Sequence, residues 1–249
     1  MTRQAPLAVL SALAEEQQGL VNALLDAECV RYAGRDFWLG RMHGIPVVLA
    51  LSRIGKVAAA TTTAALIERF GAQRMVFTGV AGGVGDGVAV GDVVVGKGFV
   101  QHDMDASPLF PRYQIPLTGQ SVFTGDANLT ARLLDAAQLA LADGGPRGGA
   151  RLHTGLIASG DRFVSGAQEA AALVAALRSA GHMPLAVEME GAAVAQVCAD
   201  HGVAFAAVRT ISDRADDTAH VDFPRFVREV ASIYALGIMD HLLQSLSKK

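Results

Sequence analysis

Residues 185–194, with the sequence LAVEMEGAAV, restrict the possible fold more than any other stretch of the chain. The apolar residues that follow Pro184 predict a short buried strand. From Gly191 onward the apolar residues recur at helical spacing, and Gly202 supplies a stop signal. A buried strand that passes directly into a helix is typical of an α/β protein.

Two carboxylates, Glu188 and Glu190, stand at this change from strand to helix. If the strand continues through Met189, the two side chains share one face and point into the same space. Two like charges beside an apolar core are costly unless cationic or hydrogen-bonding groups meet them, so the pair is a candidate site. The alternative is that an acid at this position only complements the positive end of the helix dipole.

The rest of the chain alternates apolar strand segments with helical segments. Strands are expected at 7–13, 37–43, 46–52, 74–78, 88–95, 151–158 and 204–213, with an extension of the sheet over 98–105. Helices are expected at 14–25, 54–71, 126–142, 166–180, 191–202 and 223–246, and irregular segments at 106–119 and 144–149. This alternation predicts a single α/β domain over residues 1–249, a mixed twisted β-sheet flanked by helices on both faces. In such sheets ligands bind beyond the carboxyl ends of the strands.

The glycine-rich segment 78–87, TGVAGGVGDG, follows one of these strands and suggests phosphate or dinucleotide binding. That interpretation requires a helix directly after the loop, so that its amides meet the anion. The next residues, Val88–Val95, are rich in β-branched side chains and predict a strand instead. What remains is a loop whose backbone can approach a ligand closely.

Composition excludes several classes of partner. The net charge is −3, which offers no bulk attraction for nucleic acid or for an anionic membrane. No run approaches the roughly 20 apolar residues of a membrane span. The two cysteines, Cys29 and Cys198, lie far apart and form no metal or redox motif, which fits a reducing cytoplasm.

A metal site is the alternative use of His102, Asp103 and Asp105. Because no second histidine stands at a useful spacing, we expect no metal there. No cofactor motif is present elsewhere, and we expect the protein to work without one.

Seven segments together resemble one family. They are SALAEE at 11–16, IGKVA at 54–58, TGVAGG at 78–83, VGDVVV at 90–95, ASGDRFV at 158–164, AVEME at 186–190 and VRTISD at 208–213. Over residues 7–245 the chain resembles the bacterial 5′-methylthioadenosine/S-adenosylhomocysteine nucleosidases of the nucleoside phosphorylase superfamily. The resemblance implies a nucleoside phosphorylase-like fold and an N-glycosyl hydrolase that releases adenine.

The resemblance also implies catalytic roles. Asp213 would protonate purine N7, with Ser212 helping to position it. Glu16 would activate the attacking water, with Arg209 nearby. These residue types suit the reaction, because base protonation relieves the charge on the leaving group and carboxylates stabilise the positive ribose.

The substrate-binding residues follow from the same resemblance. Glu190 would hold the ribose diol together with the backbone of Met189, and Phe163 would stack on adenine while the Val164 backbone contacts its edge. The remaining expected substrate contacts are Leu13, Ile54, Val80, Ala81, Gly82 and Glu188. Phe223 resembles the aromatic residue that a partner subunit lends to the 5′ pocket, so a homodimer is expected. The alternative for Phe223 is a hydrophobic staple at the start of its own helix.

Two departures from the family pattern stand out. Val80 occupies the position where the family commonly has serine, and the loop 104–119 differs from the best-known members. Because that loop resembles the part that shapes the 5′ pocket, four substrates stay open. They are methylthioadenosine, S-adenosylhomocysteine, 5′-deoxyadenosine and an aminodeoxyfutalosine-type nucleoside.

Two other functions are also compatible with these residues. A purine nucleoside phosphorylase would need arginines around a phosphate, whereas the first strand is followed by Glu15 and Glu16, and Arg53 is the one residue that favours it. A non-catalytic nucleoside-binding module would use the stacking and diol-binding groups but not Glu16 and Asp213. A nucleoside hydrolase uses all of them.

Overall fold

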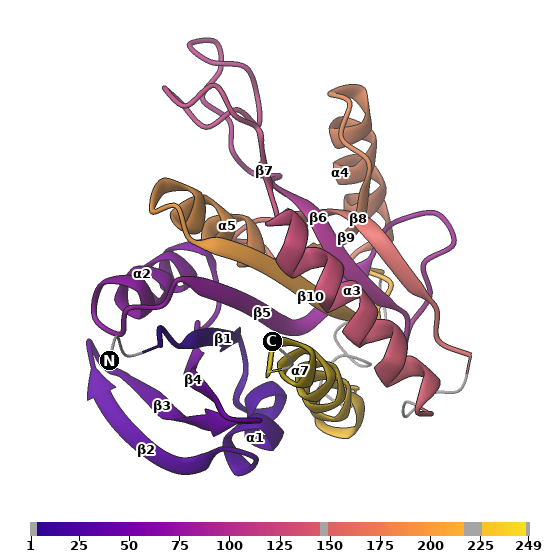
Figure 1. The fold of residues 1–249 in the computed structure, drawn as a ribbon. Coiled ribbons are helices and arrows are strands. Elements are labelled where there is room, and N and C mark those ends of the chain that lie inside the picture. The colour runs from indigo at the N-terminus through magenta and orange to yellow at the C-terminus, as the bar shows by residue number, and fades with distance from the viewer. Residues whose placement is uncertain (1–3, 145–148, 217–225, 248–249) are drawn as a thin grey trace.

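The computed structural model describes residues 4–144, 149–216 and 226–247, and Figure 1 shows their arrangement. The strands are β1 (Leu7–Ser11), β2 (Leu25–Tyr32), β3 (Arg35–Met42), β4 (Ile45–Leu51), β5 (Arg74–Gly83), β6 (Val93–Gln101), β7 (Val122–Thr124), β8 (Leu152–Ser159), β9 (Pro184–Glu188) and β10 (Ala204–Asp213). The helices are α1 (Ala14–Asn22), α2 (Lys56–Glu68), α3 (Ala127–Ala142), α4 (Ala167–Ser179), α5 (Gly191–Asp200) and α7 (Ser232–Ser247), with a π-helical turn, η1 (Val227–Ala231), before α7.

The strands form one mixed sheet, part of which closes on itself. Strands β5, β10, β6, β8 and β9 pair in that order, and β9 pairs back to β5 in antiparallel fashion. From β5 the sheet continues through β1 and β4 to the antiparallel strands β3 and β2. The predicted mixed α/β sheet is therefore confirmed, with a closed ring of strands that the sequence pattern did not indicate.

Both faces of the central part of the sheet are buried by helices, and alternate side chains of each strand point to opposite faces. On one face Leu7 and Val9 of β1 pack in a cluster with α1, α3 and α7. On the other face Ala8 and Leu10 pack in a cluster with α2 and α5. Figure 1 shows α3 and α7 side by side in front of the sheet. The helices on both faces agree with the prediction.

Three local predictions were wrong. The first helix ends at Asn22 instead of continuing to residue 25, and β2 follows it as an exposed edge strand that the sequence did not predict. Strand β5 continues through the glycines to Gly83, where a loop was expected, because β10 and β9 both pair with it there. The strand expected at 88–95 begins only at Val93. The start expected for the last helix, at Phe223, and most of the segment 144–149 lie outside the described residues.

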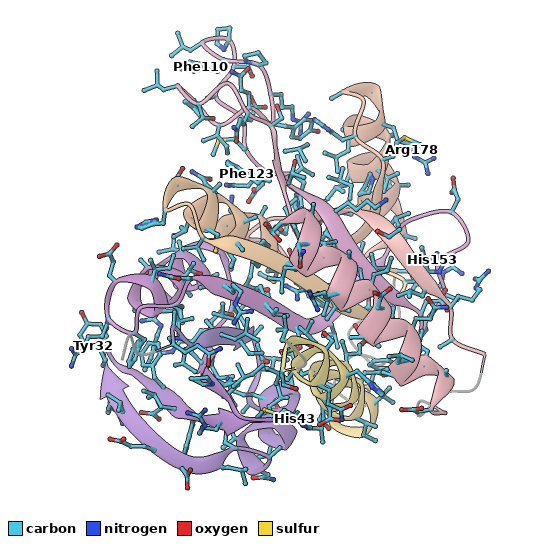
Figure 2. All side chains as sticks on the ribbon, viewed as in Figure 1. Tyr32, His43, Phe110, Phe123, His153 and Arg178 are labelled. Carbon is cyan, nitrogen blue, oxygen red and sulfur yellow. The ribbon has the colours of Figure 1, made fainter. Side chains whose placement is uncertain are left out.

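An arm projects from the sheet between β6 and β7, and its residues 106–119 form no helix or strand, as predicted. We define this arm as residues 102–121, and in Figure 2 Phe110 lies near its far end. Tyr113 and Ile115 are buried and anchor the arm on the body, whereas Leu109 and Leu117 are 84% and 92% exposed. Among the described residues, no helix has the length and apolar character needed to cross a membrane.

Candidate active site

A pocket of about 430 Å³ lies where β1, β5, β9 and β10 end. Its lining collects residues from six separate segments of the chain. They are Ala12, Leu13, Glu16, Ile54, Val80, Ala81, Gly82, Arg162, Phe163, Val164, Val187, Glu188, Met189, Glu190, Ser212 and Asp213. The strand ends thus bring together most of the residues that the resemblance singled out.

Glu16 occupies the third position of α1 and is buried beside the pocket. One of its carboxylate oxygens accepts hydrogen bonds of 2.9 Å from the amides of Ala12 and Leu13, and the other accepts one of 3.1 Å from Val80. Burial raises the pKa of Glu16, although these amides and the charge of Arg209 oppose the rise. The carboxylate therefore caps α1 and also lies at the pocket with an elevated proton affinity.

Glu188 is bonded on all sides by groups of the protein itself. It accepts hydrogen bonds from Arg209 at 2.8 Å, from the Gly191 amide at 2.9 Å and from the Ser159 hydroxyl. The amide of Glu190 adds a further bond of 3.2 Å. Glu188 thus caps the N-terminus of α5 and pairs with a buried arginine, so the helix-dipole alternative describes it well.

Glu190 follows the end of β9 and is held differently. The strand ends at Glu188, so the two acids do not lie on one strand face as expected, although both reach the pocket. Glu190 accepts a hydrogen bond of 2.8 Å from the Gly55 amide at the start of α2. Burial and the neighbouring Glu188 raise the pKa of Glu190 to about 8. Glu190 is therefore the member of the pair suited to meet a ligand.

Asp213 ends β10 and is buried next to Ser212. One carboxylate oxygen accepts a hydrogen bond of 2.8 Å from the Ala215 amide, and the other lies 2.7 Å from the Ser212 hydroxyl. That hydroxyl also lies 3.4 Å from the carbonyl oxygen of Ala81. The hydroxyl donates to the carboxylate at the shorter of these two distances, so Ser212 and the Ala215 amide hold Asp213 in place at the pocket.

Glycines in β5 make room for these carboxylates. A Cβ on Gly79 would lie 3.0 Å from an oxygen of Glu16, and one on Gly82 would lie 3.0 Å from an oxygen of Asp213. Both distances are shorter than ordinary van der Waals contact. The glycine-rich segment therefore serves the site as a strand that acidic side chains can approach closely. The sequence identified the segment as a candidate for ligand contact, but it did not predict the close approach of the acidic side chains.

The remaining lining is largely apolar. Leu13, Ile54, Val80, Phe163 and Val164 all reach the pocket, as expected. Ile54 and Phe163 stay 59% and 43% exposed, so the pocket is open along this side. An apolar, partly open pocket next to three carboxylates suits a flat, uncharged ring with a polar sugar.

Neither of the two arginines that the sequence singled out lines the pocket, although Arg209 lies close enough for its charge to act on Glu16, as expected. Arg209 is buried beneath the pocket and does not line it, because its guanidinium bonds Glu188 and the Phe77 carbonyl and covers the Phe77 ring. Arg53 donates to the carbonyl of Gly34 and is also absent from the lining. Within the described residues, Arg162 is the sole cationic residue of the lining, and Glu169 pairs with it at 2.7 Å. Sequence reasoning missed Arg162, which directly precedes the expected stacking residue Phe163.

Of the three residues considered for a metal site, His102 packs its ring against Gly160. Asp103 bonds Lys56, and Asp105 bonds the Ser107 amide. In the part of the chain that the structure describes, no group of three histidine, cysteine or acidic side chains could hold a metal ion. Phe223 lies outside the described residues.

Comparison with known proteins gives a consistent result. Residues 6–244 match the model of the Phosphorylase superfamily. A 5′-methylthioadenosine/S-adenosylhomocysteine nucleosidase of Shewanella baltica is 35% identical over 234 residues, which are 94% of this chain and 94% of that protein.

Solved structures agree with the sequence matches. A nucleosidase of the same name from Neisseria meningitidis, in complex with methylthio-immucillin-A, superposes with a TM-score of 0.86 at 34% identity. The match covers 97% of this chain and all of that one. A futalosine hydrolase of Helicobacter pylori superposes with a TM-score of 0.84 at 32% identity, covering 95% of this chain and 96% of that one.

Proposed function

The chain belongs to the phosphorylase superfamily and, within it, to the 5′-methylthioadenosine/S-adenosylhomocysteine nucleosidases, and from this premise we propose that it hydrolyses the N-glycosidic bond of a 5′-substituted adenosine. The observation that carries the proposal is the pocket, where Glu16, Glu190 and Asp213 surround an apolar cavity of about 430 Å³. The products are adenine and the 5′-substituted ribose.

The proposed roles follow the charges that develop as the bond breaks. The leaving base becomes negative, and Asp213 protonates its N7 while Ser212 keeps the acid in place. The ribose becomes positive, and Glu16 takes a proton from the attacking water. Glu16 suits this role because its pKa is raised by burial, which makes it a stronger base.

Binding uses the other side of the pocket. Glu190 accepts hydrogen bonds from the ribose 2′- and 3′-hydroxyls, supported by the Met189 backbone. Phe163 stacks on the adenine ring and the Val164 backbone contacts its edge. Arg209 and Glu188 support the site from below, because Arg209 donates to Glu188 and Glu188 also accepts from the Ser159 hydroxyl.

Hydrolysis is favoured over phosphorolysis by the charges around the pocket. A phosphate dianion would need several cations around it. Glu16, an acid, instead lines the part of the pocket proposed for the attacking water, and Arg53 donates to the Gly34 carbonyl outside the lining. The futalosine hydrolase likeness keeps an aminodeoxyfutalosine-type nucleoside among the candidate substrates. The proposed class is therefore 5′-modified adenosines, with the 5′ group still to be measured.

We also place the enzyme in the cytoplasm as a homodimer. The free cysteines fit a reducing compartment. A dimer would cover the exposed Leu109 and Leu117 of the arm and close the open side of the pocket.

The decisive experiment measures adenine release from methylthioadenosine, S-adenosylhomocysteine, 5′-deoxyadenosine and aminodeoxyfutalosine in phosphate-free buffer. We expect release without phosphate from at least one of them, and a loss of turnover of ~10²–10⁴-fold in both Asp213→Asn and Glu16→Gln. Asp213→Asn should retain substrate binding. A requirement for phosphate with formation of a ribose 1-phosphate would refute hydrolysis, and binding without any product would indicate a nucleoside-binding module.

A further inference from the structure

The start of α2 is capped by two carboxylates that come from other parts of the chain. Gly55 has a φ of +92° and no capping side chain of its own. Its amide donates to Glu190 at 2.8 Å, and the next amide, of Lys56, donates to Asp161 at 2.7 Å. The helix terminus therefore joins the proposed ribose-binding carboxylate to the loop that carries Phe163.

Asp161 is in turn tied to the end of β6. Its amide donates to Asp103 at 2.9 Å, and the other oxygen of Asp103 accepts from the Lys56 ammonium at 2.6 Å. Lys56 thus bonds Asp161 through its backbone and Asp103 through its side chain. The three residues form a closed ring of hydrogen bonds, which we name the Lys56 clamp.

The clamp is connected to α5 as well. The Lys56 ammonium also donates to Gln101 at 3.0 Å, and Gln101 donates to Gln196 of α5 at 2.8 Å. Helix α5 begins at Gly191, directly after Glu190. The clamp and its extension therefore reach Glu190 from both α2 and α5.

Packing and charge both fix the clamp. A Cβ on Gly160 would lie 2.3 Å from the His102 ring, so the backbone next to Asp161 rests directly on that ring. Burial alone would raise the pKa of Asp103, but its hydrogen bonds from Lys56 and Asp161 outweigh burial and lower it. Asp103 is therefore the ionised partner that a lysine requires.

None of the three clamp residues lines the pocket. We propose that Lys56, Asp103 and Asp161 are positioning residues that hold the base-binding loop at a fixed distance from Glu190, so that the enzyme discriminates a ribose from a 2′-deoxyribose. This inference rests on the proposed function. A ribose substrate must stack its base and bind its diol at the same time, so the distance between the base-binding loop and Glu190 matters. The clamp would set this distance through side chains that contact neither base nor sugar.

The test compares methylthioadenosine with its 2′-deoxy analogue in wild-type protein, Lys56→Met and Asp103→Asn. Both substitutions break the 2.6 Å ion pair, and Lys56 and Asp103 reach the surface with side-chain exposures of 16% and 32%, so the fold should survive. We expect kcat/KM for methylthioadenosine to fall about tenfold or more, through a higher KM, and kcat/KM for the deoxy analogue to change little. Binding of free adenine should stay unchanged. Lys56→Arg should recover part of the discrimination.

The matched control breaks an ion pair of similar length far from the clamp. Arg178 of α4, labelled in Figure 2, pairs with the exposed Asp86 at 3.0 Å, and Arg178→Met should alter neither substrate. An equal loss for both substrates, or no loss for either, would overturn the clamp, because a purely structural role lowers both together. Thermal unfolding shows whether each variant is folded. If Lys56→Met is not folded, Lys56→Gln takes its place in the comparison. Failure of the wild-type protein to release adenine would instead refute the proposed function.

Discussion

Glu190 combines a proposed role in binding with a cost in stability. Its pKa of about 8 results first from burial and then from the charge of Glu188, so the folded protein favours the protonated acid. An acid whose pKa is raised in the folded state contributes stability below its unfolded pKa of about 4.5. That contribution is lost as the pH rises from about 4.5 to about 8.

Glu190→Gln should therefore remove this pH dependence. At pH 9 we expect the variant to melt on the order of 5 °C above the wild-type protein, and at pH 4.5 the two should melt within about a degree. Thermal unfolding across this range is the measurement, and activity should be lost in the same variant. A wild-type protein that gains stability relative to Glu190→Gln between pH 4.5 and pH 9 would contradict the assignment.

At the residue scale the sequence identified both acids but could not separate their roles. Glu188 and Glu190 have the same side chain and stand two residues apart. Their surroundings differ because their hydrogen-bond partners are distant in sequence. Ser159 and Arg209 both donate to Glu188, whereas Glu190 accepts from the Gly55 amide at the pocket. The resemblance favoured Glu190 for the diol, and that role stays a prediction. Arg209 shows the limit of residue type, because its position under the pocket depends on contacts with Phe77 that no local pattern indicates.

At the scale of elements, the glycine-rich end of β5 was predicted as a loop, and the reason lies in the preferences of glycine. Glycine is disfavoured in strands because it loses more backbone entropy and packs no side chain. Pairing with β10 along one side and with β9 at Gly82 and Gly83 outweighs that preference. Edge strand β2 was missed for a related reason, because its largely exposed residues give no alternation of buried and exposed positions.

Gly79→Ala tests whether β5 requires glycine at this position so that the Glu16 carboxylate can approach the strand closely. The new methyl group would lie 3.0 Å from Glu16, so the carboxylate must move, and we expect kcat/KM to fall roughly 10²-fold while secondary structure is retained. Gly237→Ala in α7 is the matched control, because its nearest contact would be an ordinary 3.6 Å from Ala140. The control should keep full activity. Unchanged activity in Gly79→Ala would show that the glycine is not needed to make room for the Glu16 carboxylate.

At the scale of the whole molecule, the arm carries the two most exposed large apolar side chains among the described residues. Tyr113 and Ile115 fix it to the body, yet it presents the almost fully exposed Leu109 and Leu117. The exposed Val57 of α2 and Ile54 at the pocket add to the apolar surface of the molecule. Isolated apolar residues on a surface are common, and under the proposed homodimer the arm would carry these residues into the contact between subunits. The sequence predicted an irregular segment here, but its projection depends on the anchoring contacts of Tyr113 and could not be predicted.

The proposed homodimer makes a prediction about how its sites are shared. Phe223 stays a prediction as the residue that a partner places over the 5′ group, because it lies outside the described residues. An apolar lid over a 5′-thioalkyl group is worth ~0.8 kcal/mol per buried CH₂. Phe223→Ala should therefore weaken the binding of methylthioadenosine more than that of adenosine, whose 5′-hydroxyl gains little from an apolar cover.

Mixing Phe223→Ala subunits with Asp213→Asn subunits separates a shared site from a self-contained one. In a heterodimer, one of the two sites would combine a wild-type Asp213 with a wild-type Phe223 from the other subunit. Activity of the mixture should then exceed that of either variant alone, and sedimentation should give the mass of a dimer. If Phe223 is only a staple for its own helix, it acts within its own subunit and mixing restores nothing. An active monomer would likewise exclude the shared site, because the open side of the pocket would then need no second chain.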